Sequence, residues 1–143
     1  MVRRYLVWAV VCGMLVLALA GCGLPATARA ATMLRVTRTS HYLPGVDRTI
    51  TDPVSVQRLL GAVPDLRRVP EGEYYCPVDL GTEYHLAFIT AGASPTKMLM
   101  DGSGCRFIRI EPSGPTYFQT DEFRALFSAV TGIRLIEPRQ PTG

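Results

Sequence analysis

Four cysteines are the residues of this chain whose type and spacing carry the most chemistry. Cys12 and Cys22 lie in or next to a long apolar run near the start of the chain, whereas Cys76 and Cys105 lie 29 residues apart in the rest of it. No two of them have the Cys-x-x-Cys spacing of a zinc site or a thioredoxin-like motif. The two pairs therefore need separate explanations, which their surroundings supply.

The apolar run has the layout of a signal peptide. Arg3 and Arg4 precede it, and every residue from Leu6 to Ala20 is apolar or glycine, which gives the positive n-region and the apolar h-region of an export signal. The run is shorter than the roughly 20 residues that a membrane-spanning helix needs. A single-span anchor remains the alternative, because no charged residue lies between Arg4 and Arg29.

The end of this run, Leu19-Ala20-Gly21-Cys22, resembles the lipobox of bacterial lipoproteins at all four positions. The resemblance implies that residues 1–21 are removed and that the Cys22 thiol carries a thioether-linked diacylglyceryl group, whose fatty acids include palmitate. Residues 22–32 would then tether a domain to the extracytoplasmic face of the cell membrane, since two acyl chains anchor a protein stably. The pattern Ala28-Arg29-Ala30 is an alternative cleavage site, which would release a soluble secreted protein.

In an exported chain, Cys76 and Cys105 are predicted to form a disulfide. They are the two cysteines left once Cys12 is removed and Cys22 is acylated, and an oxidising compartment favours the bond. Closing a loop of this length stabilises a fold by about 3 to 4 kcal/mol in the chain-entropy model. A two-thiolate metal site or a catalytic thiol is the alternative, which the spacing does not favour.

The residues around these cysteines carry a second resemblance. The segments Tyr75-Cys76-Pro77-Val78-Asp79-Leu80-Gly81, Tyr84-His85-Leu86-Ala87-Phe88 and Gly104-Cys105 look like those of small uncharacterised exported proteins of actinobacteria and similar bacteria. These proteins carry a Cys-Pro-x-Asp-x-Gly segment and a later Gly-Cys. The resemblance covers the larger, C-terminal part of the chain. It implies a disulfide-bonded secreted domain and no particular activity.

Residues for serine-based hydrolysis are few. The chain has two histidines, His41 and His85, and no Gly-x-Ser-x-Gly nucleophile elbow. Ser103 lies in Asp101-Gly102-Ser103-Gly104, which is typical of a tight turn between strands. Ser40 and His41 are adjacent and would face opposite sides of a strand. The sequence therefore favours a protein that is not an enzyme.

Two further alternatives use carboxylates or soft metal ligands. Asp79 with Glu83 could form the carboxylate pair of a small exported hydrolase, although an Asx-turn at Asp79 and a solvated Glu83 explain both residues more simply. Met98 and Met100, with His85 on a neighbouring predicted strand, could bind copper in a copper-handling lipoprotein. Ordinary packing of methionine in a core explains the same pattern, so no metal or other cofactor is expected.

The segment from residue 65 to residue 81 is the candidate binding loop. Proline and glycine recur along it, which predicts an irregular surface segment, and Cys76 would pin it covalently. Tyr74, Tyr75 and Asp79 are its candidate binding residues, because tyrosine offers a rigid, amphipathic ring at interfaces. The alternative is that Tyr74 and Tyr75 only shield the disulfide.

Periodicity predicts the elements that hold these residues. Period-2 alternation indicates two strands joined by a Pro44-Gly45 turn, then a three-stranded meander after the loop. These strands are expected at 34–38, 48–51, 84–89, 97–101 and 105–110. Helical spacing follows two good N-caps, Asp52 and Thr120. The helical faces are Val56, Leu59, Leu60 and Val63, and Phe123, Leu126, Phe127 and Val130.

We therefore expect residues 33–143 to form a single small α+β domain. It should have two layers, a mainly antiparallel sheet with two amphipathic helices on one face, and one disulfide. The composition, 48% hydrophobic and 19% charged, suits a folded domain. Without Arg3 and Arg4, thirteen basic residues face twelve acidic ones, which argues against nucleic acid as a partner. The expected function is binding of an envelope component or a partner protein.

Overall fold

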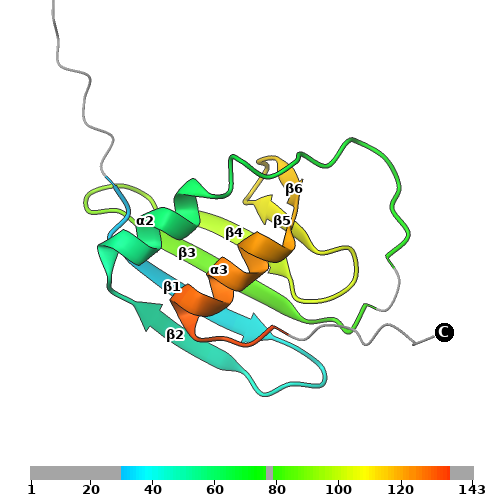
Figure 1. Ribbon diagram of the computed structural model, residues 1–143, viewed down its shortest axis with the longest axis horizontal. Helices are drawn as coiled ribbons and strands as arrows, with labels where there is room; N and C mark the ends of the chain where they lie inside the picture. Colours follow the sequence, from blue (N-terminus) through cyan, green and yellow to red (C-terminus); the bar gives the residue numbers. More distant parts are fainter. Residues whose placement is uncertain (1–29, 77–78, 136–143) are drawn as a thin grey trace, which may run out of the picture.

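The computed structural model describes residues 30–76 and 79–135. The lipobox with Cys22, the apolar run and most of the tether lie outside the described residues. One antiparallel sheet of six strands forms the body of the domain, in the order β2-β1-β3-β4-β5-β6 (Figure 1). The strands are β1 (Met33–Thr39), β2 (Val46–Ile50), β3 (Glu83–Ile89), β4 (Thr96–Asp101), β5 (Phe107–Ile110) and β6 (Thr116–Phe118).

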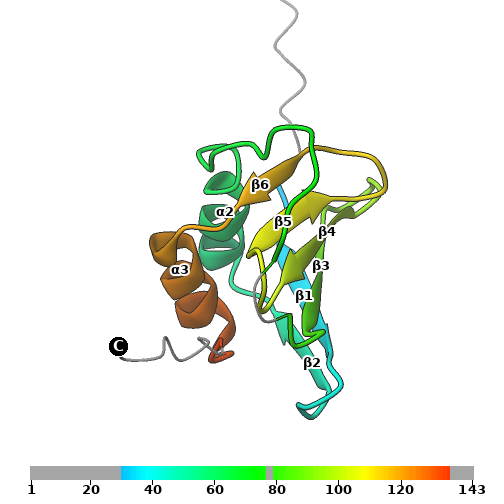
Figure 2. The ribbon, with the colours of Figure 1, turned by 90° about the vertical axis from the view of Figure 1, so that its right-hand side faces the viewer.

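The two helices cover one face of this sheet. Helix α2 (Pro53–Gly61) begins where the Asp52 side chain accepts a hydrogen bond from the Ser55 amide, and helix α3 (Asp121–Thr131) begins with the equivalent bond from Phe123 to Thr120. Gly132 ends α3 with a φ of 66°, a left-handed conformation that glycine adopts without a Cβ clash. Figure 2 shows both helices on the same side of the strands. The predicted α+β two-layer fold is confirmed.

Strict alternation along the strands separates the two faces of the sheet. Tyr84, Leu86 and Phe88 on β3 are buried under the helices, and Met98 and Met100 on β4 lie beside them. The residues between them point to the other face, which we call the outer face. Burial of one face drives the fold, while the outer face is left for polar side chains.

The boundaries of several elements differ from the prediction. The structure has a sixth strand, β6, which the sequence pattern did not predict because three residues are too short to show a period. Strand β5 begins at Phe107 rather than Cys105, because Arg106 takes a left-handed turn conformation with a φ of 55°. Ser40 and His41 lie in the loop after β1 and not in a strand, so the prediction that they face opposite sides of one was wrong. Within the described residues, neither helix is long and apolar enough to cross a membrane.

Candidate functional site

The predicted disulfide between Cys76 and Cys105 is present, with the two Cα atoms 4.8 Å apart. It joins the end of the candidate binding loop to the turn between β4 and β5. A Cβ on Gly104 would lie 3.5 Å from the Cβ atoms of both Cys76 and Asp79, so the backbone packs closely against the cross-link. The loop is therefore fixed to the sheet at its C-terminal end.

The start of the loop is fixed by the edge of the sheet. The amide of Phe118 donates to the Arg67 carbonyl at 2.9 Å, and the amide of Val69 donates to the Thr116 carbonyl at 2.8 Å. Arg68 forms an antiparallel bridge with Tyr117. Residues 67–69 thus extend the sheet beyond β6, and the segment that the sequence predicted to be irregular begins as a paired edge. The backbone groups of β6 are satisfied by this pairing.

The two neighbouring tyrosines of the loop have different environments. The Tyr74 ring packs edge-on against Phe107 and Phe118, with centroids 5.5 and 6.1 Å away, and its hydroxyl donates to the Pro70 carbonyl at 2.9 Å. Tyr75 is 95% exposed. Tyr74 therefore holds the loop onto the outer face of β5 and β6, whereas Tyr75 is available to a partner.

Asp79 closes the turn that follows the disulfide. Its Oδ1 accepts hydrogen bonds from the Gly81 amide at 2.8 Å and from the Ser103 hydroxyl at 3.3 Å, while Ser103 Oγ accepts from the Leu80 amide at 3.0 Å. This confirms the predicted Asx-turn. Ser103 is buried in this turn, and its hydroxyl is bonded to Asp79 and not to a histidine. The turn interpretation of Ser103 is thus supported over a nucleophile.

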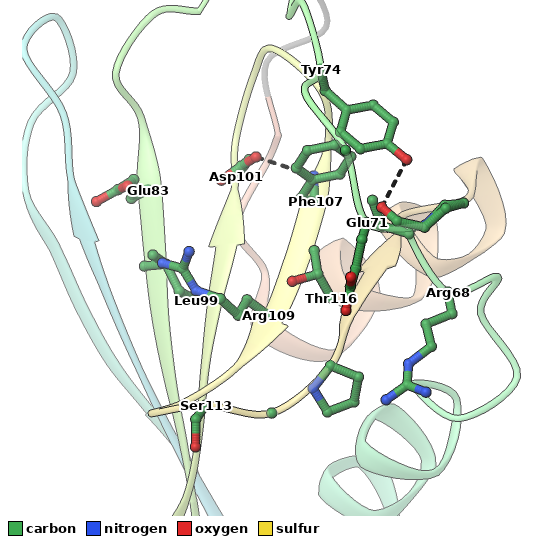
Figure 3. Close-up of a pocket in the computed structure, with 15 residues that line it drawn as sticks. Arg68, Glu71, Tyr74, Glu83, Leu99, Asp101, Phe107, Arg109, Ser113 and Thr116 are labelled. Atoms are coloured by element: carbon green, nitrogen blue, oxygen red, sulfur yellow. Dashed lines mark hydrogen bonds between the residues drawn. The ribbon is translucent and has the colours of Figure 1, made fainter.

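A groove of about 820 Å³ opens between the loop and the outer face of the sheet (Figure 3). The loop forms one wall with residues 68–72 and Tyr74, and the turn between β5 and β6 forms another with residues 113–116. The floor consists of outward side chains of β3, β4 and β5: Glu83, Leu99, Asp101, Phe107 and Arg109. Sequence reasoning missed this groove. The alternation of each strand showed which of its positions face outward, but it did not show which loop crosses those positions.

Two acidic residues occupy neighbouring positions on the groove floor. Glu83 and Asp101 are directly opposite each other on β3 and β4, and Asp101 Oδ2 accepts a hydrogen bond from the Phe107 amide at 3.2 Å. Partial burial raises the pKa of Asp101; the nearby Asp79 and Glu83 charges add to the rise, while the Phe107 amide bond and the Arg109 charge act against it. The carboxylate that the structure places beside Glu83 is thus Asp101, whereas Asp79 is engaged in its turn.

Gln119 holds this end of the groove in place. Its side-chain amide donates to the carbonyl oxygens of Asp101 at 2.8 Å and Phe107 at 2.7 Å. Its own oxygen accepts a bond from Arg124 of α3, and both side chains are buried. A buried network with these bonds made is rigid, so the outer-face residues at the start of β5 are positioned from the helix side.

The structure separates the side chains of the proposed copper site. Met98 and Met100 are 2% and 0% exposed on the helix side of β4, whereas His85 lies on the outer face of β3, opposite Leu99. The two methionines therefore pack in the core and do not converge with His85. In the described part of the chain, no three His, Cys, Asp or Glu side chains are grouped to hold a metal ion.

The other histidine, His41, packs against the backbone at the disulfide end of the domain. A Cβ placed on Gly81, which has a φ of 58°, would lie 2.8 Å from His41 Cδ2. Next to it, the Ser40 and Thr82 hydroxyl oxygens are 2.8 Å apart. These contacts give His41 and Ser40 a role in joining the loop after β1 to the turn before β3.

No protein-family model, no curated protein and no solved structure matches this chain.

Proposed function

We propose that the protein is an exported, lipid-anchored binding domain without enzymatic activity, which engages an envelope component or a partner protein. The lipobox-like Leu19-Ala20-Gly21-Cys22 segment supports the anchor. The observation that carries the binding role is how the described parts of the candidate binding loop are held: residues 67–69 pair with β6, Tyr74 packs on Phe107 and Phe118, and Cys76 is cross-linked to Cys105. A loop that is ordered before it binds loses little conformational entropy on binding.

The path of the chain supports an orientation for this domain. Ala31 is buried, and the Thr32 amide donates to the Ile89 carbonyl at 2.9 Å, so the folded part begins at the start of β1. The Cys76–Cys105 disulfide follows the end of β4, where Asp101 pairs with Glu83 and Glu83 with Thr39, so it lies at the opposite end of the strands from Met33. A tether from Cys22 to Ala30 spans at most about 30 Å. The loop end would therefore face away from the membrane to which Cys22 is attached.

A small hydrolase is the second candidate, favoured by the Glu83 and Asp101 carboxylates in the groove. Side chains directly opposite on antiparallel strands have Cβ atoms about 4.5 to 5.5 Å apart, from which two carboxyl groups can reach the separation of about 5 Å used by retaining glycosidases. Asp101, whose pKa is raised, would be the general acid. Among the described residues, no arrangement of side chains supports copper handling.

Site-specific cross-linking in intact cells tests the binding role. A photoreactive residue at position 75 should give an adduct with a partner, because Tyr75 is 95% exposed on the fixed loop. The matched control is position 54 on α2, where Val54 is 75% exposed on the helix side. Equal adducts at both positions, or none at position 75, would contradict the proposal. A hydrolytic activity lost in Asp101→Asn would favour the second candidate.

Cell fractionation tests the anchor. The native protein should have an intact mass that corresponds to an acylated N-terminal Cys22, and Cys22→Ser should move it from the membrane to the soluble fraction. A mature form that begins at Ala31 would instead identify a secreted protein. A form that retains Arg3 and Arg4 would identify a single-span anchor.

A further inference from the structure

We propose that the outer-face groove binds a small zwitterion with one ammonium and one carboxylate group, of the size of a dipeptide with free ends. This inference deepens the proposed binding function and rests on it, since it names the ligand class of the same surface. It follows from the way in which charges of opposite sign are separated along the groove.

The charged side chains of the groove are not paired with one another. The two ion pairs in the described part of the chain, Arg35–Asp47 and Arg106–Asp121, both lie outside the groove. Inside it, Asp101 receives one backbone hydrogen bond and forms no ion pair with Arg109, although the charge of Arg109 still acts on it and lowers its pKa. Opposite charges that line one cavity without forming an ion pair can each take a ligand group of the opposite sign.

The acidic end of the groove suits an ammonium group. Glu83 and Asp101 lie side by side, the Phe107 ring lies next to Asp101 (Figure 3), and the Tyr74 ring packs on Phe107 from the loop wall. Carboxylates supply charge-assisted hydrogen bonds, and aromatic faces attract a cation. A bare metal ion fits less well, because no third carboxylate, histidine or cysteine is grouped with the pair within the described residues.

The basic end of the groove suits a carboxylate. Arg109 is directly opposite Leu99, which precedes Asp101 by two residues, and Figure 3 shows its side chain extending toward Leu99. Arg68 lines the groove from the loop wall. The planar guanidinium group matches a carboxylate with two parallel hydrogen bonds. Arg109 is therefore the basic side chain at this end of the groove, while the loop wall carries both Arg68 and Glu71.

The spacing between the two ends sets the size of the ligand. A two-residue step along a strand is about 6.7 Å, which separates the Glu83–Asp101 row from the Leu99–Arg109 row. An extended dipeptide places its terminal charges about 7 Å apart. Leu99 and Phe107 also line the groove, one at each end, where they can contact the apolar side chains of such a ligand.

The probe is the dipeptide Ala-Leu, titrated into the isotope-labelled full-length protein in detergent and followed by amide NMR. We expect saturable shifts at Leu99, Asp101, Phe107 and Arg109. N-acetyl-Ala-Leu and Ala-Leu-amide, which each lack one charge, should bind at least about tenfold more weakly, as the loss of one charge-assisted contact predicts. No saturable shift, or equal binding of all three peptides, overturns the inference.

Variants identify which end binds which group. Asp101→Asn, with Glu83→Gln as a second acidic variant, should bind Ala-Leu and N-acetyl-Ala-Leu equally. Arg109→Gln should bind Ala-Leu and Ala-Leu-amide equally, and the control Arg35→Gln, outside the groove, should behave as wild type. If capping matters at one end alone, the groove is an amine or an anion site and the inference is wrong. Cross-linking at position 75 would then still support the proposed binding function. If neither that cross-link nor dipeptide binding is observed, both the binding function and the zwitterion ligand are overturned.

Discussion

The two faces of the single sheet differ in what holds their covering layers in place. The inner face is covered by α2 and α3 through fully buried apolar side chains such as Leu86, Phe88 and Phe127. The outer face is partly covered by residues 67–76 of the candidate binding loop through one disulfide, a short paired edge and a few aromatic contacts. Inward residues of the strands thus pack against the helices, whereas the outward residues that alternate with them line the groove.

This difference shows how a small domain can combine stability with an open polar site. A buried apolar face supplies most of the folding free energy. A loop with little apolar surface cannot be held in that way, and a covalent cross-link restricts it instead. The groove can therefore keep Glu83, Asp101 and Arg109 exposed to a ligand without loosening the core.

The largest effect should come from the inner face. Phe127→Ala should lower the free energy of unfolding by about 3 to 5 kcal/mol, because it removes a fully buried ring packed on Tyr84. Leu99→Ala on the outer face should cost about 1 kcal/mol or less. Urea unfolding of both variants with the disulfide intact provides the measurement. Similar costs for the two would show that the outer face is a second core.

Loss of the disulfide should be the next largest effect. Cys105→Ser should cost about 2 to 5 kcal/mol, since the unfolded chain regains the freedom of the closed loop. Hydrogen exchange should accelerate most at the Val69 and Phe118 amides, which pair the loop with β6. The amides between β1 and β3 should change least. Uniform acceleration across all strands would contradict the separation of the two faces.

The neighbouring tyrosines should differ in a smaller way. Tyr74→Ala should cost about 1 to 2 kcal/mol, because it removes two ring contacts and a hydrogen bond to Pro70. Tyr75→Ala, at a side chain that is 95% exposed, should stay within about 0.5 kcal/mol of wild type. Thermal unfolding of the two variants in parallel checks the contrast, which equal shifts would refute.

The smallest effect is a pH dependence of opposite sign at two aspartates. Burial raises the pKa of Asp101, so its contribution to stability is present below its unfolded pKa of about 4 and is lost as the pH rises through the folded value. Asp101→Asn should therefore be more stable than wild type at neutral pH, with the gain vanishing in acid.

Asp47 is the control for this titration. The hydrogen bond and charge of Arg35 lower its pKa, so its contribution is present above the unfolded pKa and is lost as the pH falls through the folded value. Asp47→Asn should be slightly less stable than wild type at neutral pH and equal to it in acid. Unfolding curves at a series of pH values measure both variants. Changes of the same sign would contradict the assigned environments.

Local patterns were sufficient for much of the fold and part of the site. The caps at Asp52 and Thr120, the alternation of β3 and the Asx-turn at Asp79 depend on residues a few positions apart, and the structure confirms each of them. The Cys76–Cys105 pair was predicted as well, because few cysteines remained to choose from. Contacts between distant segments were not predictable in this way. Tyr74 on Phe107 and Phe118, and Glu83 beside Asp101, are examples.

The sequence by itself determined both helices, five of the six strands, the class of fold and the disulfide, because periodicity, capping and cysteine count act locally or by elimination. Only the tertiary structure decided which side chains share a face and a cavity. It placed Met98 and Met100 in the core, away from His85, and it brought residues 67–74 across β5 and β6 to close a groove. The physical reason is that strand order and register are set by burial summed over the whole sheet, a quantity that no single segment contains.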